Sequence, residues 1–167
     1  MGCLYNFFKT SKSKEYPNYY EYFLKISGSK AHNPVIFIFD NELETKDKPL
    51  KKFFDNYVKD EETKKKMKTQ LYAHLLKSTN LYSVTNPILD VSSKEAEIEH
   101  LFSDEVLETK IDGKPLSLSG DYDKSKYYGK VTFSKYIMDN YKTIDFTNFK
   151  TILDNISKIV QEYRDTV

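Results

Sequence analysis

The sequence contains a single cysteine, Cys3, and this scarcity excludes several classes of small protein. A disulfide framework and a multi-cysteine zinc site each need more than one cysteine. A chain with one thiol fits a reducing compartment. Because 167 residues can bury a real core, no such covalent or metal staple is needed to hold one domain together.

Long apolar runs are also absent. No stretch approaches the roughly 18 residues that a membrane-spanning helix requires. The first residues, from Met1 to Asn6, lack the apolar segment of a signal peptide. Gly2 stands where an N-myristoylated chain begins, but Asn6 occupies the position where Ser or Thr is required. We therefore expect a cytoplasmic protein without a membrane partner.

The charge is nearly balanced, and turn-forming residues are scarce. There are 26 Lys and Arg against 25 Asp and Glu, a net charge of +1. This excludes a grossly basic nucleic-acid coat and an acidic tail protein, but it leaves room for a local basic patch. Five glycines and five prolines predict short loops and many helices. Phe and Tyr, 15% of the chain, can carry much of the core.

The one unbroken apolar run is the segment 35–39, with sequence VIFIF. It is short, β-branched and aromatic, and apolar on both faces, which favours a strand in the middle of a parallel sheet covered by helices. Residues 80–85 predict a second strand, ended by Asn86 and Pro87. Two strands are few, so either the sequence pattern conceals others or the chain is part of a larger fold.

Helical periodicity accounts for most of the remaining chain. Apolar residues recur at helical spacing over 15–25 and 50–58, and again at Met67, Leu71 and Leu75. Ser92 and Glu95 have the spacing of a capping box, which predicts a helix with Ile98, Leu101 and Phe102 facing inward. Further helices are predicted near 130–141 and, most clearly, along an apolar stripe from Phe149 to Tyr163. The order of elements indicates an α/β fold with a helix-rich C-terminal half.

Asp40 and Glu42 are the first candidate site. They follow the apolar strand, at the end where open α/β sheets place their sites, and residues two apart point the same way. Two such carboxylates can share Mg²⁺ or Mn²⁺, which can stabilise charge on a phosphoryl group and activate water. The alternative is that these acids cap the next helix or solvate a loop, because an acid-x-acid pair is a weak motif.

Two further clusters could carry chemistry. Glu95 and Glu99 share a helix face with Glu97 between them, and His100 beside them could be a ligand or a base. Their alternative role is to complement the helix dipole in the first turn. The segment SKYYGK, with Lys126 and Lys130, could hold phosphates and stack bases, or it could be a solvated turn.

Several linked segments resemble the Toprim domains that are fused behind certain retron reverse transcriptases. They are, in order, NPVIFIFDNE with DKPLKKF, NLYSVTNP, EIEHLF, ETKIDGKPL, DKSKYYGKVTFSKYI and IDFTNFKTILDNI, and together they cover roughly residues 34–163. The resemblance implies a metal-dependent nucleic-acid-cleaving fold used as an effector in anti-phage defence. It also implies a partial sheet of mostly parallel strands flanked by helices.

The resemblance assigns roles to particular residues. Asp40 and Glu42 match the acid-x-acid motif, usually DND in the family. Glu99 matches the Glu of an IEDLF-type helix, with His100 in place of its Asp. Lys130 matches the lysine of a YGK segment. The implied metal ligands for Mg²⁺ or Mn²⁺ are therefore Asp40, Glu42 and Glu99, with Lys130 as a fourth catalytic residue if the chain is active.

One departure from the family pattern concerns the start of the chain. Toprim domains begin with a strand ending in Glu-Gly, whose Glu is thought to act as general acid and base, and residues 1–33 contain no such strand. We expect one Toprim-like domain over 1–167, with a helical segment at 1–33, an α/β part at 34–104 and a helical part at 105–167.

The departure leaves two functions open. One is a non-catalytic protein that binds a retron reverse transcriptase–effector complex or nucleic acid, as a decoy, inhibitor or accessory. The other is an active Toprim nuclease that cleaves DNA or RNA. A sheet that lacks its first strands exposes an edge, which favours a partner or a homo-oligomer.

Overall fold

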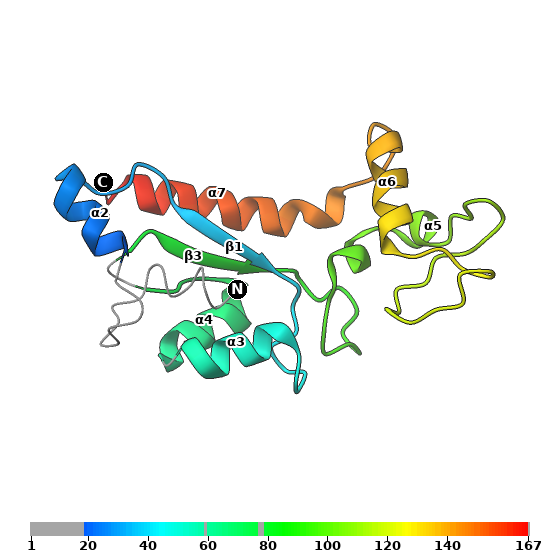
Figure 1. Cartoon of the computed structure of the whole chain (residues 1–167), viewed down its shortest axis with the longest axis horizontal. Helices are drawn as coiled ribbons and strands as arrows, with labels where there is room; N and C mark the ends of the chain where they lie inside the picture. Colours follow the sequence, from blue (N-terminus) through cyan, green and yellow to red (C-terminus); the bar gives the residue numbers. More distant parts are fainter. Residues whose placement is uncertain (1–18, 59, 77–78, 167) are drawn as a thin grey trace. The chain divides into compact units, whose positions relative to one another are not determined.

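The computed structural model describes residues 19–58, 60–76 and 79–166, and it is a mixed α/β fold. The chain forms two compact units (Figure 1). The first comprises the chain up to Ala96 together with Thr151 onward, and the second comprises Glu97–Lys150. Cys3 and the predicted start of the first helix lie outside the described residues. No described helix is both long and apolar enough to cross a membrane.

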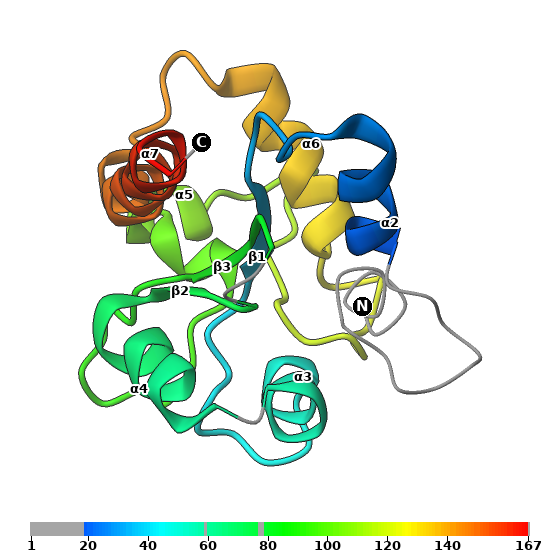
Figure 2. The same ribbon diagram turned by 90° about the vertical axis from the view of Figure 1, so that its left-hand side faces the viewer.

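A three-stranded sheet forms the centre of the first unit. Its strands are β1 (Val35–Phe39), β2 (Tyr72–His74) and β3 (Leu81–Thr85). They follow one another in the order β1-β3-β2 (Figure 2). β1 and β3 are parallel, with Val35 opposite Leu81, whereas β2 runs antiparallel to β3. The strands predicted at 35–39 and 80–85 are confirmed, and the sheet is mixed.

The prediction that VIFIF lies in the middle of the sheet is wrong. Every residue of β3 is buried, whereas β1 lies at the edge and Ile38 is 53% exposed. The central strand is β3, which contains the polar residues Ser83 and Thr85. Its sequence therefore does not show the continuous apolar run that is expected of a buried strand. Ser83 is accommodated because its hydroxyl donates to Met67 Sδ at 3.0 Å.

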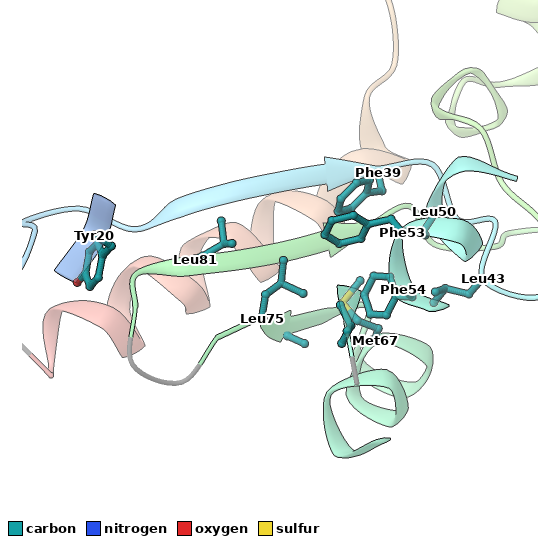
Figure 3. Close-up of a cluster of buried hydrophobic side chains, with 11 residues drawn as sticks. Tyr20, Phe39, Leu43, Leu50, Phe53, Phe54, Met67, Leu75 and Leu81 are labelled. Atoms are coloured by element: carbon teal, nitrogen blue, oxygen red, sulfur yellow. The ribbon is translucent and has the colours of Figure 1, made fainter. Parts of the chain in front are cut away.

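Helices cover both faces of the sheet. α3 (Pro49–Tyr57) and α4 (Glu61–Gln70) lie on one face, and α7 (Lys150–Arg164) lies on the other (Figures 1 and 2). α2 (Tyr19–Ser27) precedes β1. The main core packs between the sheet and α3 and α4 (Figure 3). Its largest fully buried members on these elements are Leu50, Phe54, Met67 and Leu81.

The helix predicted to continue through Leu71 and Leu75 ends earlier than expected. α4 begins at an N-cap, Asp60, whose carboxylate accepts a hydrogen bond from the Thr63 amide at 2.8 Å. It ends at Gln70, because Leu71 adopts a left-handed conformation with φ of 63°. The chain then turns into β2. The sequence analysis missed this strand because Met67, Leu71 and Leu75 have helical spacing.

The second unit is built around aromatic rings. It contains the 3₁₀ helices η1 (Ile98–Leu101) and η2 (Thr147–Phe149), with α5 (Asp104–Leu107) and α6 (Lys130–Asn140) between them. Phe102 makes edge contacts with Phe133, Phe146 and Phe149 at centroid distances of 5.0 to 5.8 Å. The helix predicted near 130–141 is confirmed, because α6 occupies nearly the same residues.

The capping box predicted from Ser92 and Glu95 is also wrong. The Ser92 hydroxyl donates to the Asp90 carboxylate instead, and no helix begins there. The reciprocal box lies further along, where Glu97 is the N-cap of η1 and His100 Nδ1 accepts the Glu97 amide. The short helix that follows buries Leu101 but leaves Ile98 43% exposed.

Candidate metal centre

The carboxyl ends of the two parallel strands gather polar side chains in the first unit. Asp40 follows β1 and Asn86 follows β3. The Asn86 amide nitrogen donates to Asp40 Oδ1 at 3.0 Å and to the Ala96 carbonyl at 3.2 Å. Asn86 is only 1% exposed, so these bonds fix it in one orientation. Asp40 therefore lies directly after β1, with its carboxylate bound to a side chain that follows β3.

Asn86 and Thr85, at the ends of these strands, each have a buried side-chain oxygen that receives no hydrogen bond from any residue that the structure describes. Both partners of the Asn86 nitrogen are acceptors, so its Oδ1 must face the other way, and it is buried without a partner. The neighbouring Thr85 Oγ1 is likewise buried and unpaired. Unpaired buried acceptors are costly unless a further group satisfies them.

A backbone bridge holds a second acidic segment against this edge. The amides of Asn41 and Ala96 donate to each other's carbonyls at 2.8 and 2.9 Å. The Asn41 side chain also donates to the Asn86 carbonyl at 3.0 Å. These bonds bring Glu95 to the same place as Glu42, although the two are far apart in sequence.

A lysine lies between these two carboxylates. Lys48 Nζ lies 3.3 Å from Glu42 Oε1 and 3.5 Å from Glu95 Oε2. The hydrogen bond to Glu42, together with the negative charge of both carboxylates, raises the pKa of Lys48. The Glu42 side chain is 10% exposed, so its charge is largely removed from water and is compensated by Lys48.

The donor set fits a hard divalent cation. Mg²⁺ and Mn²⁺ prefer oxygen ligands; the carboxylates of Asp40 and Glu42 follow β1, and the Asn86 side chain, which follows β3, is hydrogen-bonded to Asp40. Over residues 19–58, 60–76 and 79–166, no three His, Cys, Asp or Glu side chains gather as a metal cluster. The candidate ligands in the first unit are therefore the carboxylates of Asp40 and Glu42.

Glu99 and Lys130 meet in the second unit. Lys130 Nζ lies 2.8 Å from Glu97 Oε2 and 3.2 Å from Glu99 Oε2. Burial disfavours the charged form of Lys130, but the bond to Glu97 and the charge of Glu99 outweigh it and raise its pKa. A positive charge in the first turn of a helix interacts unfavourably with the helix dipole. The negative charges of Glu97 and Glu99 offset this effect at the start of α6. A metal site shared by Asp40, Glu42 and Glu99 stays a prediction.

The remaining candidates have structural roles. His100 Nδ1 accepts a backbone amide in the capping box. In the segment SKYYGK, Tyr128 is buried and its hydroxyl donates to the Thr109 carbonyl at 2.6 Å. Lys126 forms an exposed ion pair with Asp123 at 3.5 Å. Only Tyr127, which is 41% exposed, presents a ring for stacking.

The sequence analysis overlooked Asn86, Thr85 and Lys48 as site residues. A signal for the first two was available, because carboxyl ends of adjacent parallel strands meet at one edge. Asn86 had been interpreted only as a strand breaker before Pro87. Lys48 precedes α3 and gave no such signal.

No protein-family model matches this chain, and no solved structure matches it either.

Proposed function

We propose that this chain is a Toprim-like, retron-effector-related protein that is catalytically incomplete and acts by binding a partner. The partner is a retron reverse transcriptase–effector complex or nucleic acid, and the role is that of a decoy, inhibitor or accessory in phage–retron defence. Support comes from the linked sequence motifs and from the oxygen-rich edge at the ends of β1 and β3. The observation that carries most weight is the buried Asn86 side chain, whose amide nitrogen donates to Asp40 and whose Oδ1 has no partner among the described residues.

The chemistry of this edge suits a metal-assisted phosphate site. Asp40 and Glu42 would hold Mg²⁺ or Mn²⁺ there, with Asn86 orienting the Asp40 carboxylate. Such an ion stabilises negative charge on a phosphoryl group and lowers the pKa of bound water. Lys48 lies at the same edge, where its ammonium group pairs with Glu42 and Glu95.

Two features favour binding over catalysis. The 167 residues contain no Glu-Gly pair, so the acid/base group that the resemblance implies is not supplied by this sequence. The second acid of the motif, Glu42, is already neutralised by Lys48. A fold with these properties can present the family's surface to a partner without performing the reaction.

The alternative function is an active Mg²⁺-dependent Toprim nuclease that cleaves DNA or RNA as a defence effector. The observation in its favour is that Asp40 and Glu42 occupy the strand end that the motif implies, with the buried Asn86 side chain bound to Asp40. In the second unit, Glu99 and Lys130, the other two residues that the resemblance singles out, form an ion pair at 3.2 Å.

Divalent-cation binding is the direct test of the site. We expect Mn²⁺ to bind the full chain with a dissociation constant on the order of 0.1–1 mM, as at open oxygen-ligand sites. Asp40→Asn with Glu42→Gln should weaken binding at least about tenfold, because two anionic ligands are lost. Lys48→Met should strengthen it, since a competing cation is removed. Isothermal titration calorimetry measures all three.

Glu61→Gln is the matched control for this experiment. It also removes one carboxylate, but from α4, where Glu61 is 81% exposed by its side chain and pairs with Lys64. Identical titrations for wild type, the double variant and the control would show that no site exists at this edge. Far-ultraviolet circular dichroism of each variant separates lost binding from lost folding.

Partner binding is tested with a purified retron reverse transcriptase complex that carries a Toprim-type effector. We expect the chain to co-elute with this complex in size-exclusion chromatography and, in molar excess, to lower its nucleic-acid cleavage rate. Single-stranded DNA, duplex DNA and transfer RNA are assayed separately as partners. Absence of co-elution with the complex and with every nucleic acid would contradict the proposal.

A further inference from the structure

The outer edge of β1 presents backbone groups that no described strand pairs with. The Val35 amide donates to the Asn80 carbonyl at 2.8 Å, and the Asn86 amide donates to the Phe39 carbonyl at 3.2 Å. In a parallel pair, alternate residues face the neighbouring strand, so Ile36 and Ile38 direct their amides and carbonyls away from β3. Within the described part of the chain, β3 is the only strand beside β1, and these groups make no backbone hydrogen bond there.

This edge lacks the features that normally prevent strand addition. Natural edge strands carry lysine, proline, a bulge or an inward-pointing charge. β1 has none of these over its five residues, and Ile38 on the outward-facing register is 53% exposed. An apolar, regular edge of this kind is a template for another strand.

The charges that flank β1 select the occupant. Lys30 is the one lysine or arginine in residues 28–34, which precede the strand and contain no acid, whereas residues 40–48, which follow it, carry four acids against Lys46 and Lys48, a net charge of −2. If a second copy of β1 is added antiparallel, the basic end of each copy faces the acidic end of the other, twice by symmetry. Parallel addition of the same segment would align like charges instead.

We propose that β1 pairs antiparallel with β1 of a second copy of this chain, around a two-fold axis at Phe37. Ile36 of each copy then exchanges both backbone hydrogen bonds with Ile38 of the other. The pairing joins two three-stranded sheets into one sheet of six strands. Asp40 and Glu42 contribute to the charge of one end, but the backbone pairing needs neither a bound metal nor a retron partner, and it can therefore be tested separately from both.

Sedimentation velocity on the full chain tests the association. We expect wild type to shift from 19.7 kDa towards twice that mass as its concentration rises through the micromolar range. Ile38→Lys should leave only monomer, because it places a charge in the new sheet. Val91→Lys makes the same kind of change at a residue that is 99% exposed and outside the sheet, and it should leave association unchanged. A wild type that is monomeric at every concentration would overturn the proposal.

Cysteine cross-linking tests the register, in a Cys3→Ser background. Directly opposed residues of a hydrogen-bonded antiparallel pair have Cα atoms about 5.5 Å apart, within disulfide reach. A mixture of Ile36→Cys and Ile38→Cys chains should therefore form a disulfide dimer on mild oxidation. Either variant alone should not, because the same residue in two copies lies more than about 7 Å apart. Efficient cross-linking of one variant with itself would contradict this register.

Discussion

Replacing Ile159 by alanine is expected to lower the free energy of unfolding by about 2–5 kcal/mol. Ile159 lies on α7 with no exposed surface, in the stripe that packs on the sheet. The substitution removes three buried carbons and leaves a cavity that the surrounding side chains only partly fill. Urea denaturation followed by circular dichroism measures the change in midpoint.

α7 itself supplies the matched controls. Leu153→Ala removes a comparable side chain from the same helix, but Leu153 is 59% exposed, so its cost should stay below about 1 kcal/mol. Ile156, which the sequence pattern placed fully in the stripe, is half-buried and should give an intermediate value. Equal effects at Ile159 and Leu153 would mean that α7 packs differently from the structure.

The strongly periodic elements could be predicted because local pattern decides them. The stripe from Phe149 to Tyr163 follows the helical repeat, and α7 occupies 150–164. Leu153 departs from the expected stripe because the sheet covers only a narrow band of the helix. β1 and β3 were located correctly because β-branched and aromatic runs bounded by breakers have few other solutions.

The elements that were mispredicted depend on contacts distant in sequence. β2 forms because β3 offers an antiparallel edge, as shown by Ala73 opposite Ser83, and no local pattern encodes that partner. Leu71 adopts a left-handed backbone conformation, which is unfavourable for leucine. The pairing of β2 with β3 must therefore stabilise the chain by more than continuing α4 would. Ser92 bonds to Asp90, two residues before it, and this local turn outcompetes the predicted helix start.

The candidate site was likewise predictable only in part. The position of Asp40 and Glu42 at a strand end was predictable, since it needs only the end of VIFIF. The identity of their neighbours was not, because Asn86, Lys48 and Glu95 are brought there by strand pairing and by the Asn41–Ala96 bridge. Glu99 and Lys130 were singled out only through the family resemblance, and in the structure they form an ion pair.

The purified chain is expected to cleave nucleic acid very slowly in the presence of Mn²⁺. General acid/base catalysis typically contributes about a hundred- to ten-thousand-fold to such reactions, and this sequence lacks the Glu-Gly pair whose Glu the resemblance assigns to that role. Its rate should therefore fall short of a complete Toprim nuclease by about that factor. The assay incubates equal amounts of both proteins with single-stranded DNA, duplex DNA and transfer RNA.

Variants separate slow cleavage by this chain from a contaminating nuclease. Cleavage that belongs to the chain should disappear in Asp40→Asn, which removes a proposed ligand, and persist in Glu61→Gln on the exposed face of α4. Robust, Asp40-dependent cleavage would overturn the non-catalytic proposal in favour of the nuclease. The search for a replacement base would then begin with Glu95, which lies 3.5 Å from Lys48 at the same edge, and with Glu99 and His100 in the second unit.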